Sequence, residues 1–178
     1  MKKQNFVYVI IVIFSISVIA CQKKDADNKK IQVSTNQSEN PKAPDFALQS
    51  VDGKTIKLSD YKGEIVIIDF WATWCEPCRM GIPDLVEIQN DYQGRVAVIG
   101  ISLDMEGQTK QDVPDFVKAF KINYPILYCN EKVINDYGGV QSIPSTFIVD
   151  QKGNVIANFI GLTSKSDFVD RINELLKK

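Results

Sequence analysis

The most informative run in this sequence is Ile68-Asp-Phe-Trp-Ala-Thr-Trp-Cys-Glu-Pro-Cys78. Its first residues belong to Glu64–Phe70, a short apolar segment rich in β-branched residues, which predicts a buried strand. Its two cysteines, Cys75 and Cys78, open a segment with helical apolar spacing that we expect to form a helix over Glu76–Tyr92. The run therefore joins a buried strand directly to a helix and places two cysteines at the start of that helix.

Two cysteines at a helix start are suited to redox chemistry. With two residues between them, the first turn of the helix can bring both sulfur atoms within bonding distance. Unpaired N–H groups and the helix dipole stabilise a thiolate at this position. We therefore expect Cys75 to be an exposed nucleophile and Cys78, one turn further along, to be the buried resolving thiol. Pro77 fits the first turn, where no intrahelical N–H bond is lost.

Two other roles for this pair remain open. Half of a zinc site would need further ligands, but the sequence has no second CxxC motif and no histidine, and Cys129 alone does not complete a four-ligand site. A structural disulfide is the second alternative. Because a bridge across two residues closes a very small loop, it would constrain the unfolded chain little. We therefore favour redox catalysis and expect neither a metal nor another cofactor.

The segments on either side of the pair predict an α/β fold. A β-hairpin is expected where Asp52-Gly53 separates two short extended segments, Asp45–Ser50 and Lys54–Leu58. Beyond those already named, the predicted strands are Val96–Leu103, Pro125–Tyr128, Thr146–Val149 and Val155–Gly161, and the predicted helices are Val113–Phe120, Glu131–Tyr137 and Ser166–Lys178. This order predicts a central mixed β-sheet flanked by helices on both faces, with an N-terminal β-hairpin.

The composition narrows the chemistry further. The chain has 178 residues, with 21 Lys and Arg, 22 Asp and Glu, and no His. A net charge of -1 argues against a nucleic-acid-binding protein, which needs a concentrated basic face. The absence of histidine excludes Ser-His-Asp and Cys-His nucleophiles and HExxH zinc sites. Acid–base steps are left to carboxylates, thiols, Tyr or Lys.

The N-terminus has the pattern of an export signal. Lys2 and Lys3 precede an uncharged run over residues 6–20, shorter than the roughly 18–20 apolar residues that span a bilayer. Because this run ends in Val-Ile-Ala-Cys21, it resembles a bacterial lipobox, and we expect residues 1–20 to be a lipoprotein signal peptide and Cys21 to carry the lipid. A short uncleaved anchor and a plain signal peptide are the alternatives. All three place the remaining chain outside the cytoplasm, at the outer face of the bacterial cell membrane or in the periplasm.

A tether and one folded domain are expected after the signal. Residues 22–42 hold few apolar side chains, so they cannot bury enough surface to offset the entropy lost on ordering. We therefore expect residues 21–42 to be the lipidated cysteine with a flexible tether, and residues 43–178 to be the domain.

Together these motifs resemble the thioredoxin superfamily, and within it the TlpA/ResA-like branch of membrane-anchored bacterial lipoproteins. The similar segments besides the CxxC run are Ala43-Pro-Asp-Phe46, Leu58-Ser-Asp-Tyr-Lys-Gly63, and Ser142-Ile-Pro-Ser-Thr-Phe-Ile-Val-Asp150 followed by Lys152-Gly153. The resemblance implies a thioredoxin-like fold and thiol-disulfide oxidoreductase activity. It further implies protein disulfides as substrates. A reductant outside the cytoplasm needs electrons from across the membrane, so we expect a membrane thiol protein as the electron donor.

The resemblance also implies a role for individual residues. Cys75 would attack a substrate disulfide and Cys78 would resolve the mixed disulfide. Asp69 would accept the proton of Cys78, which suits a buried carboxylate because burial raises its pKa. Pro144 would form a cis peptide bond and leave the backbone of Ile143 free to pair with an extended substrate.

Several of these positions have simpler interpretations. The alternative for Asp69 is a core acid with its hydrogen bonds satisfied. Trp74, which the resemblance places beside the nucleophile in the docking surface, has ordinary half-buried packing as its alternative. Members of this branch often carry Glu where this chain has Gly81, and thioredoxins often place a Lys near the buried acid. Because Val96–Leu103 has no basic residue, we expect strong desolvation of that acid. Cys129 follows an apolar run and is expected in the core, a third redox thiol being the alternative.

Charge near the pair suggests the direction of electron flow. Glu76 puts a negative charge beside Cys75, and no His or Lys lies between the cysteines, which disfavours a strongly oxidising protein. We therefore expect a disulfide reductase, and the resemblance suggests apocytochrome c, as in cytochrome c maturation, as one client. A thioredoxin-like peroxidase is an alternative, although the peroxiredoxin pattern Pro-x-x-x-Thr-x-x-Cys has Ile68 and Ala72 at its first two fixed positions. A redox-inert peptide-binding module is the non-enzymatic alternative.

Overall fold

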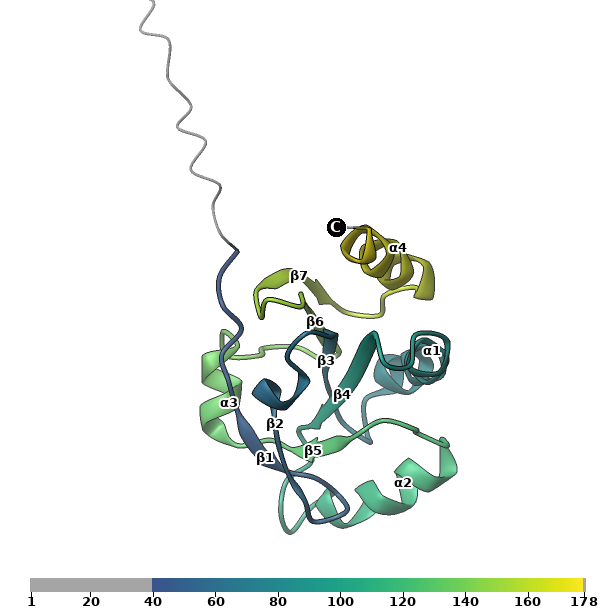
Figure 1. Cartoon of the computed structure of the whole chain (residues 1–178). Coiled ribbons are helices and arrows are strands. Elements are labelled where there is room, and N and C mark those ends of the chain that lie inside the picture. The colour runs from purple at the N-terminus through teal and green to yellow at the C-terminus, as the bar shows by residue number, and fades with distance from the viewer. Residues whose placement is uncertain (1–39, 178) are drawn as a thin grey trace, which may run out of the picture. The chain divides into compact units, whose positions relative to one another are not determined.

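The computed structural model describes residues 40–177, so the expected signal peptide, Cys21 and nearly all of the expected tether lie outside the described residues. The strands are β1 (Ala47–Gln49), β2 (Thr55–Lys57), β3 (Ile65–Trp71), β4 (Val96–Ser102), β5 (Ile126–Tyr128), β6 (Ser145–Val149) and β7 (Val155–Ile160). The α-helices are α1 (Glu76–Asp91), α2 (Val113–Ala119), α3 (Glu131–Asp136) and α4 (Lys165–Leu176). Each predicted strand and helix is present, with small shifts at its ends (Figure 1). None of these helices is long and apolar enough to cross a lipid bilayer.

β3 is the middle strand of a five-stranded sheet with the order β5-β4-β3-β6-β7. β3, β4 and β5 run parallel, whereas β6 is antiparallel to β3 and β7 is antiparallel to β6. The residues of β3 and β4 are buried throughout because helices cover both faces, which explains their nearly continuous apolar sequence. The predicted mixed sheet is confirmed, and β1 and β2 form the predicted N-terminal hairpin.

The alternation of side chains along β3 separates two apolar clusters, one on each face of the sheet. Ile67 and Trp71 pack with α1, α2 and α4 on one face. Ile68 and Phe70 pack with β1 and α3 on the other face. Figure 1 shows α1 and α4 together on one side of the sheet and α3 on the opposite side. Asp69 shares its face with Ile67 and Trp71, so its side chain lies on the α1 side.

Residues 41–51, which we call the lead-in segment, contact both edge strands of the sheet. At one edge, the N–H of Val155 in β7 donates to the carbonyl oxygen of Pro41 at 2.8 Å. At the other edge, the N–H of Val51 donates to the carbonyl oxygen of Ile126 in β5 at 2.9 Å. Contacts of this kind protect edge strands from pairing with other chains.

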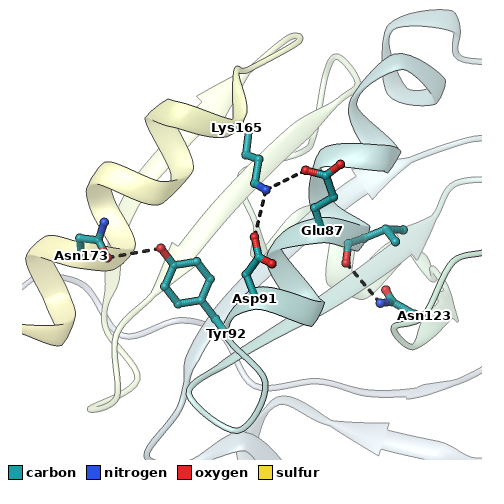
Figure 2. A network of polar contacts seen from close by, with 7 residues as sticks. Glu87, Asp91, Tyr92, Asn123, Lys165 and Asn173 are labelled. Carbon is teal, nitrogen blue, oxygen red and sulfur yellow. Dashed lines mark hydrogen bonds and ion pairs between the residues drawn. The ribbon is translucent and has the colours of Figure 1, made fainter.

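Polar contacts fix α4 on α1. Lys165, the first residue of α4, places its ammonium 2.7 Å from Glu87 and 3.0 Å from Asp91, both on α1 (Figure 2). Tyr92, which ends α1, donates a hydrogen bond from its hydroxyl to Asn173 of α4 at 3.3 Å. The start of α4 is therefore held against the helix that carries the two cysteines.

Candidate active site

Cys75 and Cys78 form a disulfide at the N-terminus of α1. Cys75 caps the helix, since its Sγ accepts a hydrogen bond from the N–H of Cys78 at 3.3 Å. The two Cα atoms lie 5.3 Å apart, an ordinary separation for a disulfide. Pro77 lies in the first turn, as predicted. Both sulfur atoms thus occupy the place where helix N–H groups favour negative charge.

The disulfide is covered by the surrounding protein. Cys75 is 5% exposed and Cys78 is 2% exposed. The prediction that Cys75 is exposed is wrong for this oxidised form, because its side chain is bonded to Cys78 and belongs to the apolar cluster that contains Trp71 and Ala72. The N–H of Cys75 also donates to the carbonyl oxygen of Ala72 at 3.1 Å, which turns the loop back toward β3. Little of the sulfur pair is therefore exposed to solvent in this oxidised form.

The residues next to the disulfide are open to solvent. Trp74 is 62% exposed, which does not fit the alternative of ordinary half-buried packing. Glu76 forms an exposed ion pair with Arg79 at 3.7 Å, and the guanidinium of Arg79 lies 5.6 Å from the centre of the Phe120 ring. The negative charge that Glu76 places beside Cys75 therefore has a cationic neighbour one turn away.

Asp69 is a buried acid beneath this helix start. Its residue is 4% exposed, and its Oδ1 accepts one hydrogen bond, from the hydroxyl of Thr146 at 2.8 Å. Burial raises the pKa of Asp69 to about 7, although the hydrogen bond from Thr146 lowers it. No basic residue contributes to this shift, in agreement with the absence of Lys and Arg from β4. A single hydroxyl is the hydrogen-bond donor to this carboxyl group among the described residues.

Gly100 of β4 makes room beside this acid. It pairs with Asp69 in the sheet register. A Cβ atom at position 100 would collide with Cδ1 of Ile126 and lie 3.0 Å from Nε1 of Trp71. Tyr124 lies on the same side, where burial and the charge of Asp69 raise the pKa of its phenol. Glycine at this position therefore lets large side chains pack directly against the strand next to the acid.

The Ile143–Pro144 peptide bond is cis, as predicted. The carbonyl oxygen of Pro144 accepts a hydrogen bond from the N–H of Gly161 at 2.8 Å, which joins this loop to the end of β7. Among the residues that the structure describes, the N–H and C=O of Ile143 form no hydrogen bond. Within the described part of the chain, Ile143 therefore keeps an unpaired backbone donor and an unpaired backbone acceptor.

A small cavity of about 20 Å³ brings the predicted residues together. Asp69, Cys78 and Pro144 all line it, although they come from β3, α1 and the loop before β6. Sequence reasoning missed Thr146, which faces the same cavity and is the hydrogen-bond partner of the acid. Its position two residues after the cis proline was the available signal.

Asp104 is a second residue that sequence reasoning missed. It is buried just after β4, and its carboxylate accepts hydrogen bonds from the Thr73 N–H at 3.0 Å, the Thr73 hydroxyl at 2.6 Å and the Ser102 hydroxyl at 2.7 Å. These bonds hold the loop between β3 and α1, two residues before Cys75. The available signal was its place directly after β4, because the ends of the parallel strands β3 and β4 lie at the same edge of the sheet.

Cys129 lies outside this site. It is a free thiol, and it is half-buried where the sequence predicted a core position. Burial raises the pKa of the Cys129 thiol, which disfavours the reactive thiolate. Within residues 40–177, no group of three or more His, Cys, Asp and Glu side chains is placed to bind a metal ion.

Comparison with known proteins agrees with this geometry. The family model described as the AhpC/TSA family matches residues 40–158. A thiol-disulfide oxidoreductase ResA of Bacillus thuringiensis (strain Al Hakam) is 31% identical over 183 residues, which cover 100% of this chain and 98% of the relative.

Solved structures give the same picture. A thiol:disulfide interchange protein of the thioredoxin family from Chlorobium tepidum TLS is 32% identical with a TM-score of 0.70, over 77% of this chain and 97% of that one. A pneumococcal exposed lipoprotein thioredoxin from Streptococcus pneumoniae strain TIGR4 is 32% identical with a TM-score of 0.66, over 74% of this chain and 100% of that one. These likenesses cover the part of the chain that carries the disulfide, the buried acid and the cis proline.

Proposed function

This chain belongs to the AhpC/TSA family of thioredoxin-like proteins and is a thiol-disulfide oxidoreductase, and we propose that it works as a protein-disulfide reductase outside the cytoplasm. The observation that carries the proposal is the Cys75–Cys78 disulfide at the start of α1, with Asp69 buried across a water-sized cavity. The pKa of Asp69, about 7, allows this carboxyl group to gain or lose a proton near neutral pH.

The proposed reaction starts from the reduced protein. The thiolate of Cys75 attacks one sulfur of the client disulfide, which forms a mixed disulfide and releases one client thiolate. Cys78 gives its proton to Asp69 and attacks the sulfur of Cys75, which closes the Cys75–Cys78 disulfide and releases the second client thiolate. Two electrons pass to the client. The protons that the pair gives up, one to solvent and one through Asp69, balance those that the two client thiolates take up.

The proposed docking surface consists of Trp74, Ile143 and Pro144. The exposed indole of Trp74 offers apolar area beside the disulfide. The unpaired backbone groups of Ile143 suit an extended client segment, which would pair with the loop before β6 as a short strand does.

The direction of electron flow is proposed from charge. Glu76 lies between the cysteines and disfavours a thiolate at Cys75, although its ion pair with Arg79 offsets part of this effect. A less stabilised thiolate makes the pair a better reductant. We therefore expect a reduction potential closer to about −270 mV than to about −120 mV.

Location and partners extend the proposal. A lipid on Cys21 would hold the domain at the outer face of the membrane, and the pneumococcal relative is itself described as an exposed lipoprotein. A reductase in that position needs a membrane thiol protein to supply electrons. Apocytochrome c is the client that the family resemblance suggests. If Cys21 carries the lipid, the wild-type protein incorporates a labelled fatty acid and a Cys21→Ser protein does not, and equal labelling of the two proteins contradicts the lipid anchor.

Trapping tests the assigned roles of the two cysteines. Cys78→Ser should accumulate mixed disulfides with clients, because the resolving thiol is missing, whereas Cys75→Ser should accumulate none. Non-reducing gels and mass spectrometry of the trapped species measure this, and the reduction potential is measured against a dithiothreitol or glutathione couple. The reverse trapping pattern, or a potential near about −120 mV, contradicts the proposal.

Two assays separate the remaining alternatives. Consumption of peroxide without reduction of an insulin-type disulfide would indicate a peroxidase. Retained cellular function in a Cys75→Ser, Cys78→Ser double variant would indicate a redox-inert binding module. Rapid reduction of the insulin-type disulfide by the purified wild-type protein is the expected result.

A further inference from the structure

The cavity between the buried acid and the second cysteine is lined by both polar and apolar side chains. Its volume of about 20 Å³ is room for about one water molecule. Asp69 and Thr146 are its buried polar lining residues. Leu162, from the loop between β7 and α4, also lines the cavity and is 50% exposed. Among the described lining residues, Leu162 is the large apolar side chain that reaches solvent.

Few groups can exchange a proton with Asp69. From α1 it meets Cys78, from β6 the hydroxyl of Thr146, and from the segment before β5 the phenol of Tyr124. β4 offers only Gly100 at the paired position. No Lys, Arg or second carboxylate lines the cavity in the described part of the chain. Among the described residues that line this cavity, Asp69 and Cys78 are therefore the only titratable groups.

Leu162 lies directly on Gly81. A Cβ atom at position 81 would be 3.3 Å from Cδ1 of Leu162, closer than ordinary van der Waals contact. Any side chain on α1 at this position would therefore push Leu162 outward. Because position 81 has no side chain, the leucine can close over the helix at the mouth of the cavity.

The loop that carries Leu162 is held on both sides. Before it, the N–H of Gly161 donates to the carbonyl oxygen of Pro144 at 2.8 Å. After it, Lys165 pairs with Glu87 and Asp91 of α1 (Figure 2). These contacts fix the position of Leu162 relative to both the cis-proline loop and α1.

We propose that Leu162, lying on Gly81, is the cover that keeps bulk water out of the Asp69–Cys78 cavity and controls how readily Asp69 exchanges its proton with solvent. The proposal rests on the proposed function of Asp69 as the proton acceptor for Cys78. With the cover in place, the acid stays desolvated and neutral until the pH nears neutrality. Leu162 touches no reacting atom, so it is a positioning residue that acts through the solvation of Asp69.

Titration of Asp69 by carboxyl-carbon NMR in the oxidised protein tests the cover. The wild-type midpoint is expected near the pKa of about 7. In Leu162→Ala, water enters and the midpoint falls by about one pH unit, because hydration favours the carboxylate. Leu162→Met keeps the apolar cover and the wild-type midpoint. Ile160→Ala, at an exposed aliphatic residue of β7 that does not line the cavity, also leaves the midpoint unchanged.

The outcomes separate this proposal from the proposed function. An unchanged midpoint in Leu162→Ala, or an equal fall in Ile160→Ala, overturns the cover even if the protein reduces disulfides. The titration needs no client, so a wild-type protein that reduces no disulfide while Leu162→Ala lowers the midpoint would refute the proposed function alone. The pH profile of mixed-disulfide resolution should move to lower pH by the same amount in Leu162→Ala.

Discussion

Asp69 couples the redox site to the stability of the domain. Burial raises its pKa from 3.8 to about 7, whereas in the unfolded chain the group would ionise near its ordinary value. Between these two values the folded protein binds one more proton than the unfolded chain, so stability falls as the pH rises through this window. The full difference is about 4 kcal/mol, since each pKa unit corresponds to about 1.4 kcal/mol.

Replacing this acid should therefore stabilise the protein at alkaline pH. Asp69→Asn cannot ionise, so its free energy of unfolding should exceed that of the wild type by as much as about 4 kcal/mol at pH 8 and differ little near pH 4. Urea denaturation of the oxidised proteins at both pH values measures this. Asp115→Asn, which changes an exposed aspartate of α2, serves as the control and should have little effect. An equal gain from Asp69→Asn at both pH values would contradict the raised pKa.

The sequence could identify the reacting residues but not their surroundings. Cys75 and Cys78 are recognisable because their chemistry depends on local spacing and on the helix that begins there. The exposure of Cys75 was predicted wrongly, because it depends on the disulfide and on tertiary packing. Leu162 and Asp104 could not be assigned from local patterns, since their contacts lie at residues 81 and 73, far away in the sequence.

Among the elements, β4 contains a glycine, Gly100, at a position where neighbouring side chains leave no room for a larger residue. Gly100→Ala adds a methyl group that collides with Cδ1 of Ile126 and approaches Nε1 of Trp71. We expect this substitution to lower the free energy of unfolding by about 1–3 kcal/mol, as overpacking does. Urea denaturation followed by tryptophan fluorescence measures the change.

A second substitution isolates the cause. Ile126→Val removes the Cδ1 atom that the new methyl group meets, and by itself it should lower the free energy of unfolding by about 0.5–1.5 kcal/mol. If the collision dominates, the Gly100→Ala, Ile126→Val double variant is more stable than the sum of the single effects predicts. Strict additivity would show that Trp71, rather than Ile126, accounts for the loss.

The order of the elements was the most predictable part of the fold. Turns such as Asp52-Gly53 and Lys152-Gly153 interrupt the apolar periodicity clearly, so strand and helix ends could be placed closely. The order of strands within the sheet is different, because β6 lies beside β3 although Val149 and its partner Val66 are 83 positions apart in the sequence, and no local pattern records that pairing.

At the level of the whole molecule, one side-chain hydrogen bond joins the lead-in segment to the end of α3. The hydroxyl of Tyr137 donates to the carbonyl oxygen of Pro44 at 2.9 Å, while its ring packs against Phe70 and Phe147. Tyr137→Phe keeps the ring contacts and removes only this hydrogen bond. We expect a loss of about 0.5–1.5 kcal/mol in the free energy of unfolding.

The lost hydrogen bond should first make the lead-in segment open more often, before it affects the unfolding of the whole domain. Hydrogen exchange should become faster at the amide of Ala43, which donates to the carbonyl oxygen of Gly153 at 2.9 Å, and at that of Val155. The amide of Val98 in β4 serves as the internal control and should change little under native conditions. Equal acceleration at all three amides would mean that the segment does not open separately from the sheet.

The backbone hydrogen bond between Pro41 and Val155 determines where the domain would yield to a pulling force on its N-terminal side. The turn between β6 and β7 lies at the end of the sheet opposite Cys75, because β6 runs antiparallel to the strand that leads to the cysteines. Tension on the chain upstream of residue 40 would load this turn first. Such tension would therefore separate the lead-in segment from β7 at the end of the sheet opposite the cysteines. The Cys75–Cys78 disulfide would keep its position.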